Sequence, residues 1–220
     1  MQTLKNDVLT VQVAEHGAEL QSIMKGATEY LWQGDPAYWG RRSPVLFPIV
    51  GSVWEKRYRV DGVEYELGQH GFARDMEFEL VGQTESELRY RLVSTEETLK
   101  KYPYQFVLEI AYRLHGNSLD VIWEVTNPSN DKELHFQIGA HPAFILPDYH
   151  DGEVHGYLRV KEVDELLGTR TMPYGYAQPE IVDEFELTNH LLPLTDNTFE
   201  CDTILDRTER ISEVELLDKE

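Results

Sequence analysis

Residues 106–125 alternate apolar and polar side chains through two runs that a single turn signal separates. Because side chains along a strand point alternately to opposite faces, each run predicts a strand with one buried and one solvated face. Gly116-Asn117 lies between the runs and predicts a hairpin turn. The apolar faces comprise Phe106, Leu108, Ile110, Tyr112 and Leu114, followed by Leu119, Val121, Trp123 and Val125. This hairpin predicts a sheet that covers a hydrophobic core with one of its faces.

The same period of two recurs outside this hairpin. Arg57–Val60 and Val63–Leu67 flank Asp61-Gly62, which is a strong signal for a two-residue hairpin turn. Further strands are predicted at Val8–Val13, Met76–Val81, Glu87–Val93 and Thr203–Glu220.

One short helix is predicted over Thr95–Tyr102, with Thr95 near its N-cap and Pro103 as its stop. Many strands with almost no helix predict an all-β sandwich or barrel. The 220 residues are 41% hydrophobic and 11% aromatic, which suffices for a sizeable core. We find no internal repeat and no linker, and therefore expect a single domain over residues 1–220.

The chain is strongly acidic, with 40 acidic and 20 basic residues and a formal charge of -20. Such a field repels phosphate backbones and anionic lipid headgroups, so nucleic acid and membrane surfaces are not expected partners. A neutral small molecule is indifferent to this field, whereas an anionic one needs a local cluster of arginines.

Cys201 is the single cysteine, so neither an internal disulfide nor a zinc-thiolate site is available. A reducing compartment fits this composition best. The start of the chain lacks the basic and long apolar regions of a signal peptide, and no apolar run reaches the ~20 residues that cross a bilayer. We therefore expect a cytoplasmic protein.

Residues 134–141, LHFQIGAH, are predicted to form the strand that carries chemistry. Leu134, Phe136, Ile138 and Ala140 share one face, which is expected to be core. The other face carries two imidazoles and an amide, from His135, Gln137 and His141, with open space at Gly139. Pro142 ends the pairing and Phe144 follows closely, so His141 is placed at the floor of a polar cleft. The plainer interpretation is an ordinary solvated strand face.

Two further segments combine glycine or proline with arginine. Residues 69–75, QHGFARD, place His70 beside a glycine that permits close approach, and Arg74 offers a planar fork for hydroxyls or an anion. The alternative is a turn with an Arg74–Asp75 surface pair. Residues 41–51, RRSPVLFPIVG, place Arg41 and Arg42 beside an apolar run. The aromatic residues upstream of this run are assigned mostly to core, although aromatic rings also suit the apolar face of a ring ligand.

Taken together, QHGFAR (69–74), GAHPAF (139–144), RRSPVLFPIVG (41–51) and EYLWQGDPAYW (29–39) resemble the aldose 1-epimerase, or galactose mutarotase-like, family. The chain is most similar to the LacX-like bacterial branch, and the likeness extends over essentially its whole length. The resemblance implies a β-supersandwich with an aldohexose on a concave face. It also implies isomerase activity in carbohydrate and galactose metabolism, the interconversion of α and β anomers.

The resemblance assigns roles to three residues. His141 matches the family's general acid, and His70 matches the histidine that binds the sugar and stabilises charge near the ring oxygen. Asp202, in ECDTIL, matches an aspartate that holds sugar hydroxyls. Histidine suits proton transfer at cellular pH because it ordinarily titrates near neutrality. Ring opening by acid and base requires no metal, nucleotide or nucleophile, and no metal-ligand spacing occurs here, so no cofactor is expected.

Arginines bind the phosphate in related hexose-6-phosphate mutarotases, which makes Arg74, together with Arg41 or Arg42, candidates for the same role. A sugar phosphate is therefore an alternative substrate. A carbohydrate-binding or regulatory protein that has lost catalysis is a second alternative, and a purely structural sandwich is a third. Monomer and homodimer both remain open.

One family feature is absent from the sequence. The family's general base is a Glu in a C-terminal EPW-type motif, whereas no tryptophan here follows Glu-Pro. Glu213, Glu215 and Glu220 lie nearest in sequence to that region, but none matches the motif. Family members are usually longer than 220 residues, so we expect a chain truncated at its C-terminus that lacks its base.

Overall fold

The computed structural model describes residues 1–146, 154–171, 176–207 and 210–218. The chain divides into two compact units, Met1–Ile145 and Leu146–Glu220. The expectation of one domain over residues 1–220 stays a prediction. Among the described residues, no helix has the length and apolar character needed to cross a membrane.

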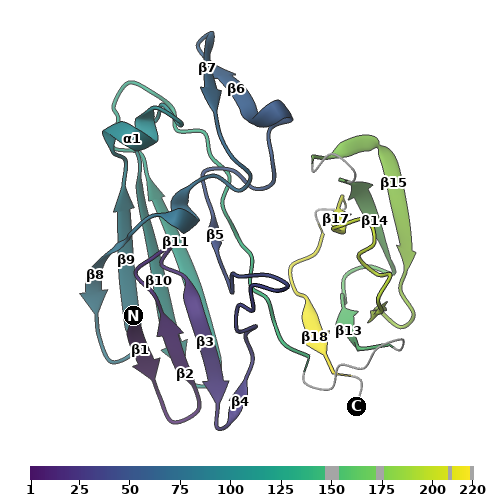
Figure 1. Cartoon of the computed structure of the whole chain (residues 1–220). Coiled ribbons are helices and arrows are strands. Elements are labelled where there is room, and N and C mark those ends of the chain that lie inside the picture. Colours follow the sequence, from purple (N-terminus) through teal and green to yellow (C-terminus); the bar gives the residue numbers. More distant parts are fainter. Residues whose placement is uncertain (147–153, 172–175, 208–209, 219–220) are drawn as a thin grey trace. The chain divides into compact units, whose positions relative to one another are not determined.

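The first unit contains two four-stranded antiparallel sheets (Figure 1). One runs in the order β1 (Gln2–Lys5), β2 (Thr10–Val13), β3 (Leu20–Lys25) and β4 (Thr28–Glu29). The other runs in the order β11 (Ser118–Thr126), β10 (Val107–His115), β9 (Glu87–Val93) and β8 (Glu79–Gln83). The predicted all-β class is thereby confirmed.

The hairpin predicted from period-two alternation forms in the expected register, with Ile110 opposite Trp123 and Tyr112 opposite Val121. Its inner face is buried along β10 and joins residues of the other sheet in one hydrophobic cluster. On β11 the prediction is wrong at Val121, which is 41% exposed. Two tyrosines of the second sheet also form hydrogen bonds with the first 18 residues. The hydroxyl of Tyr112 donates to the carbonyl of Ala18 at 2.7 Å, and that of Tyr90 donates to the carbonyl of Val13 at 3.4 Å. The two sheets therefore share one core.

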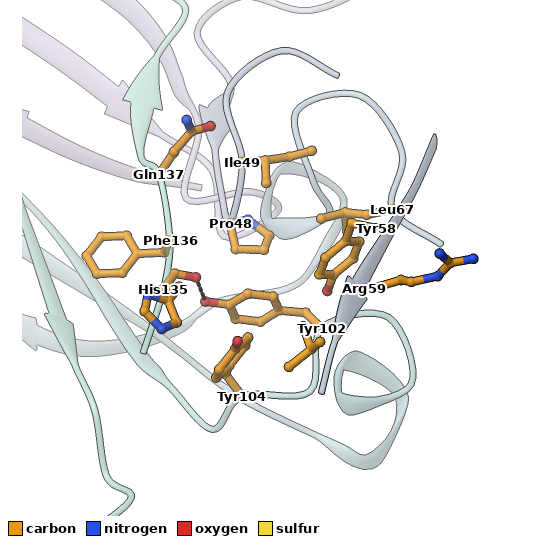
Figure 2. A pocket seen from close by; sticks show the side chains of 11 residues that line it. Pro48, Ile49, Tyr58, Arg59, Leu67, Tyr102, Tyr104, His135, Phe136 and Gln137 are labelled. Atoms are coloured by element: carbon orange, nitrogen blue, oxygen red, sulfur yellow. Dashed lines mark hydrogen bonds between the residues drawn. The ribbon is translucent and has the colours of Figure 1, made fainter. Parts of the chain in front are cut away.

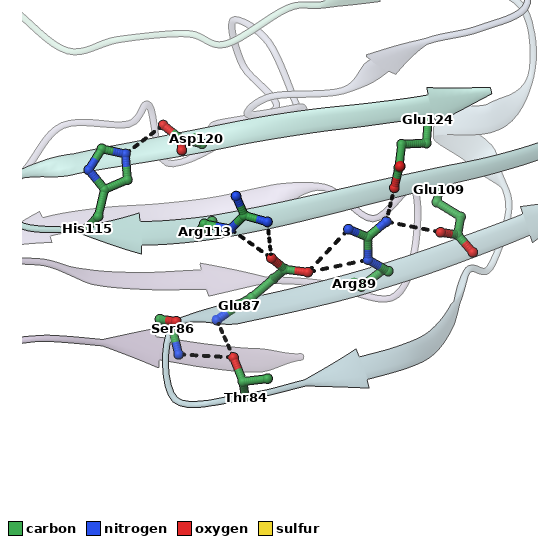
Figure 3. Close-up of polar contacts among 9 residues, drawn as sticks. All are labelled: Thr84, Ser86, Glu87, Arg89, Glu109, Arg113, His115, Asp120 and Glu124. Atoms are coloured by element: carbon green, nitrogen blue, oxygen red, sulfur yellow. Dashed lines mark hydrogen bonds and ion pairs between the residues drawn. The ribbon is translucent and has the colours of Figure 1, made fainter.

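The outer face of the second sheet carries a ladder of charged side chains (Figure 3). Arg89 lies at its centre and pairs with Glu87 at 3.3 Å, with Glu109 at 3.0 Å and with Glu124. Arg113 contacts Glu87 at 2.7 Å. Because charges at such positions require solvent or partners, this ladder explains why one face of the alternating strands stays outside the core.

Short elements complete the first unit. The hairpin β6 (Arg57–Val60) and β7 (Val63–Glu66) turns at Asp61-Gly62 as predicted, and both turn residues have positive φ. The helix α1 is shorter than predicted, covering Glu96–Leu99, with Thr95 as its N-cap. Two 3-10 turns, η1 (Trp54–Lys56) and η2 (Ala73–Asp75), and the two-residue strands β5 (Val45–Leu46) and β12 (Gly139–Ala140) lie between the larger elements.

The second unit has its own strands and apolar cluster. One sheet has the order β16 (Leu191–Leu194), β13 (Gly156–Arg159) and β18 (Glu215–Leu217), and another has β15 (Gln178–Glu186), β14 (Glu165–Arg170) and β17 (Leu205–Asp206). Val160, Val163, Leu166 and Leu192 form its core. The strand predicted over Thr203–Glu220 is reduced to the short strands β17 and β18, and residues 208–209 and 219–220 lie outside the described part.

Candidate functional site

Residues 134–141 form less regular strand than predicted, because their partner segment is short. Only Gly139–Ala140 is a strand, paired with Val45–Leu46. Two backbone bonds continue the antiparallel pairing on either side: the amide of Gln137 donates to Pro48 at 2.9 Å, and that of His141 donates to Pro44 at 3.2 Å. The segment therefore lies against residues 44–48, which keeps His141 at the end of the pairing.

The predicted division of faces along this segment is only partly correct. Leu134 and Ile138 pack against the core, but Phe136 is 41% exposed and Ala140 is also exposed. The prediction of open space at Gly139 is wrong, since a Cβ there would lie 3.2 Å from Cγ2 of Val50. The absence of a side chain at Gly139 instead allows Val50 to lie close to the segment.

His70 is held in a tight turn by its neighbour Gly71. His70 has a φ of 63° and Gly71 a φ of 70°, both in the left-handed region that favours glycine. A Cβ on Gly71 would lie 2.2 Å from the carbonyl oxygen of Phe47, which accepts bonds from the amides of Phe72 and Ala73. This explains why a glycine follows the histidine in the HG motif.

The backbone of Gly51 fixes the ring of His70. The amide of Gly51 donates to Nδ1 of His70 at 3.0 Å, and the amide of His70 donates back to the carbonyl of Gly51 at 2.8 Å. Because Nδ1 accepts this bond, the neutral ring carries its hydrogen on Nε2. His70 is thus oriented as a hydrogen-bond donor through Nε2.

The rings of His70 and His141 lie edge to face with centroids 5.8 Å apart. The ring of Trp39 packs against that of His141, with 5.0 Å between the ring centroids and an interplanar angle of 37°. His141 is exposed and His70 is half-buried. Two imidazoles that are 71 positions apart in the sequence, from 70 to 141, therefore meet in one accessible place.

Trp39 is a site residue that the sequence assignment of upstream aromatics to core did not identify. It is half-buried, and its backbone is fixed at both ends. Its amide donates to Asp35 at 2.9 Å, and its carbonyl accepts from the indole of Trp32 at 2.7 Å. The sequence offers no spacing that separates this tryptophan from a core aromatic, because its partner His141 is so distant in the chain.

The structure separates the two neighbouring arginines that the sequence left equivalent. Arg42 donates to the carbonyl of Gln21 at 2.8 Å and is therefore engaged with the first sheet. Arg41 pairs with Asp75 at 2.6 Å, and Asp75 also lies 3.8 Å from Nε of Arg74. Arg41 and Arg74 thus flank one carboxylate.

Arg74 is more enclosed than the predicted surface pair implies. Its side chain is 18% exposed, one terminal nitrogen donates to the carbonyl of Gln69 at 2.9 Å, and its buried Nε makes no hydrogen bond within the described residues. Burial, and secondarily the nearby charge of Arg41, lowers the pKa of Arg74. Through its bond to Gln69, the guanidinium stabilises the turn that contains His70.

Asp202 lies in the second unit, where it has a φ of 77° and its amide donates to the carbonyl of Phe199 at 2.9 Å. Its role in sugar binding stays a prediction. In the described parts of the chain, no three or more His, Cys, Asp or Glu side chains cluster in a way that suits a metal ion.

Comparison with known proteins identifies similar sequences. A family model described as aldose 1-epimerase matches residues 1–214. The chromosomal and plasmid forms of Protein LacX from Lactococcus lactis subsp. lactis are each 38% identical over 178 residues, covering 77% of this chain and 59% of the relative. The chain therefore spans less than two thirds of the length of these curated relatives.

Solved structures of galactose mutarotase-like proteins are similar to this chain in fold. A galactose mutarotase related enzyme from Lactobacillus acidophilus has a TM-score of 0.85 and 34% identity, covering 91% of this chain and 67% of that chain. A galactose mutarotase-like protein from Lactobacillus casei has a TM-score of 0.89 and 31% identity, covering 100% of this chain and 76% of that chain. These similarities confirm the predicted fold.

Proposed function

The chain belongs to the aldose 1-epimerase family, and we propose that it interconverts the α and β anomers of an aldohexose by acid–base ring opening. The observation that carries this proposal is the approach of His70 and His141, with ring centroids 5.8 Å apart. The two residues come from two of the four motifs that carry the sequence resemblance, QHGFAR and GAHPAF. A cytoplasmic location, and a monomeric or homodimeric state, stay predictions.

His141 is proposed as the general acid that protonates the ring oxygen as the C1–O5 bond breaks. Its ring is exposed to a ligand while Trp39 lies against it at 5.0 Å. A positioned histidine can exchange protons near neutral pH, and such a group contributes ~10²–10⁴-fold to a rate.

His70 is proposed to act differently, as a donor that binds the sugar and stabilises charge near the ring oxygen. The support is the bond from the Gly51 amide to Nδ1 at 3.0 Å, which fixes the ring and places the hydrogen of the neutral imidazole on Nε2. One imidazole thus transfers a proton while the other holds a hydrogen bond. The proton of the C1 hydroxyl passes to solvent water as the aldehyde forms, because this sequence lacks the EPW-type motif that holds the family's base.

Polarimetry with α-D-glucose and α-D-galactose tests the proposal. We expect the wild-type chain to accelerate mutarotation and His141→Asn to lower turnover by at least ~10²-fold, with sugar affinity changed little. His115→Asn is the matched control, because His115 pairs with Asp120 on the charged outer face. Equal turnover in wild type and His141→Asn removes His141 as the acid. Sugar binding by calorimetry without any acceleration selects a carbohydrate-binding protein instead.

A sugar phosphate is a second candidate substrate, and the placement of Arg41 and Arg74 around Asp75 favours it. A phosphate needs cationic partners in a chain whose net charge is -20. We expect such a substrate to bind in a salt-dependent way, whereas glucose binding does not depend on salt. Comparing the affinities of glucose and glucose 6-phosphate at two salt concentrations, in wild type and in Arg41→Gln, separates the two candidates.

A further inference from the structure

A pocket of about 340 Å³ lies within the first unit (Figure 2). Its volume falls at the lower end of the range for small-molecule sites, ~300–1,000 Å³. It is lined by Pro48, Ile49, Tyr58, Arg59, Val60, Leu67, Tyr102, Tyr104, His135, Phe136 and Gln137. Neither His70 nor His141 belongs to this set.

Aromatic rings form much of the pocket wall. The ring of Tyr104 packs against that of Tyr102 at 4.9 Å and against that of His135 at 5.9 Å. Figure 2 shows the hydroxyl of Tyr102 directed at the backbone of His135, whose carbonyl it contacts at 2.5 Å. The hydroxyl of Tyr58 is likewise held, 2.7 Å from the carbonyl of Lys101. These bonds keep the aromatic faces in fixed orientations.

The polar groups of the pocket suit a neutral ligand with hydroxyl groups. Among the residues that the structure describes, no carboxylate lines it, and the lining arginine, Arg59, is exposed and pairs with Glu64 at 3.2 Å. Gln137 accepts from the amide of Val50 at 3.1 Å through Oε1, so its NH₂ group keeps two donors. Aromatic faces with a few polar groups at the edge match a pyranose ring, which has an apolar C–H face and a polar rim.

Two chain segments connect this pocket to the histidines. Ile49 lines the pocket, whereas Gly51, two positions later, holds the ring of His70. Gln137 also lines the pocket, and His141 follows it by four residues along the segment whose backbone pairs with residues 44–48. At ~3.3 Å per extended residue this separation is about 13 Å, which exceeds a single sugar ring.

We propose that this aromatic pocket binds a pyranose ring of a reducing oligosaccharide whose reducing end lies at His70 and His141. The inference rests on the proposed function for the position of the reducing end. The substrate class is then an aldose extended by further sugar units, and the pocket contributes to affinity without contacting the reacting atoms.

Variants of Tyr104 test this proposal with glucose, maltotriose and cellotriose as probes. Tyr104→Leu is expected to raise KM for a trisaccharide by about two- to ten-fold, the factor that corresponds to one aromatic stacking contact, while KM for glucose and kcat stay unchanged. Trp54→Leu is the matched control, because Trp54 is an aromatic residue that is 63% exposed and lies outside the pocket. Equal trisaccharide KM values in wild type and in a folded Tyr104→Leu would overturn the proposal.

A second measurement uses the wild-type chain and requires neither folding of a variant nor catalysis. In NMR titrations with methyl β-maltotrioside, which cannot mutarotate, we expect the methyl signals of Ile49 and the ring signals of Tyr104 to shift. Shifts caused by phenol but not by the trioside would show an aryl site and overturn the proposal. If these shifts occur although mutarotation is absent, the proposed function alone fails. If mutarotation occurs and no pocket signal shifts, this inference alone fails.

Discussion

The indole ring of Trp39 lies against the imidazole of His141, with 5.0 Å between ring centroids and 37° between ring planes. The contact joins a loop fixed by the Trp32–Trp39 hydrogen bond to the end of the segment that carries the proposed acid. An exposed histidine side chain has several rotamers in water, and a packed ring restricts them. We therefore propose that Trp39 positions His141.

Replacing Trp39 with leucine is expected to lower kcat by about ten-fold or more, because a misplaced proton donor is costly, while KM changes little. Trp39→Phe keeps an aromatic face and should recover most of the rate. Trp54→Leu serves as the control, since Trp54 is 63% exposed on the η1 turn. Polarimetry measures the rates, and an unchanged kcat in Trp39→Leu contradicts a positioning role.

Gly71→Ala is expected to lower the free energy of unfolding by more than ~2 kcal/mol, combining a strained positive φ with a steric clash. The clash is with the carbonyl oxygen of Phe47, 2.2 Å from the new Cβ. Gly62→Ala is the matched control, because Gly62 has a φ of 79° and a Cβ there meets nothing within 4 Å. It should cost about 1 kcal/mol. Urea denaturation measures both, and equal losses would show that the close approach to Phe47 contributes nothing.

The charged ladder of the second sheet predicts a loss of stability in acid. The hydrogen bond from Arg91, followed by that from Arg89, lowers the pKa of Glu109. A carboxyl whose pKa is lower in the folded state stabilises the fold above its unfolded value of about 4.3, and this contribution disappears as the pH falls through the folded value.

Glu109→Gln should therefore lose roughly 0.5–1 kcal/mol at pH 7 and show a weaker decline in stability between pH 5 and pH 3 than wild type. Glu85→Gln is the control, because Glu85 is exposed at the turn between β8 and β9. Urea denaturation across this pH range makes the comparison. Parallel pH profiles for wild type and Glu109→Gln would show that the ladder does not contribute.

The strands were predictable where one side of the chain is core and the other is solvent. The hairpin of β10 and β11 forms in the register that alternation predicts, because its outer positions carry charges that need water or partners. Alternation failed at Phe136 and Ala140, which are exposed although their parity places them on the core face. Periodicity reports the direction of a side chain but not whether another segment covers it.

The candidate site was predictable only in part. The motifs identified His70 and His141, but their approach depends on the positive φ of His70 and on the contact of Gly71 with Phe47. Trp39 could not be distinguished from a core aromatic, because its contact with His141 joins positions far apart in the chain. Only the three-dimensional structure separates Arg41, which pairs with Asp75, from Arg42, which contacts Gln21.

The central claim is that His70 and His141 share one sugar-binding site. Side-chain nitrogen and carbon NMR signals of the two imidazoles, assigned by His70→Gln and His141→Asn, measure this directly during titration with D-galactose or D-glucose. We predict that both rings shift with one common dissociation constant, while the ring of His115 on the outer face does not respond. Signals of His70 and His141 that stay unchanged at saturating sugar, or that follow different dissociation constants, would contradict the account.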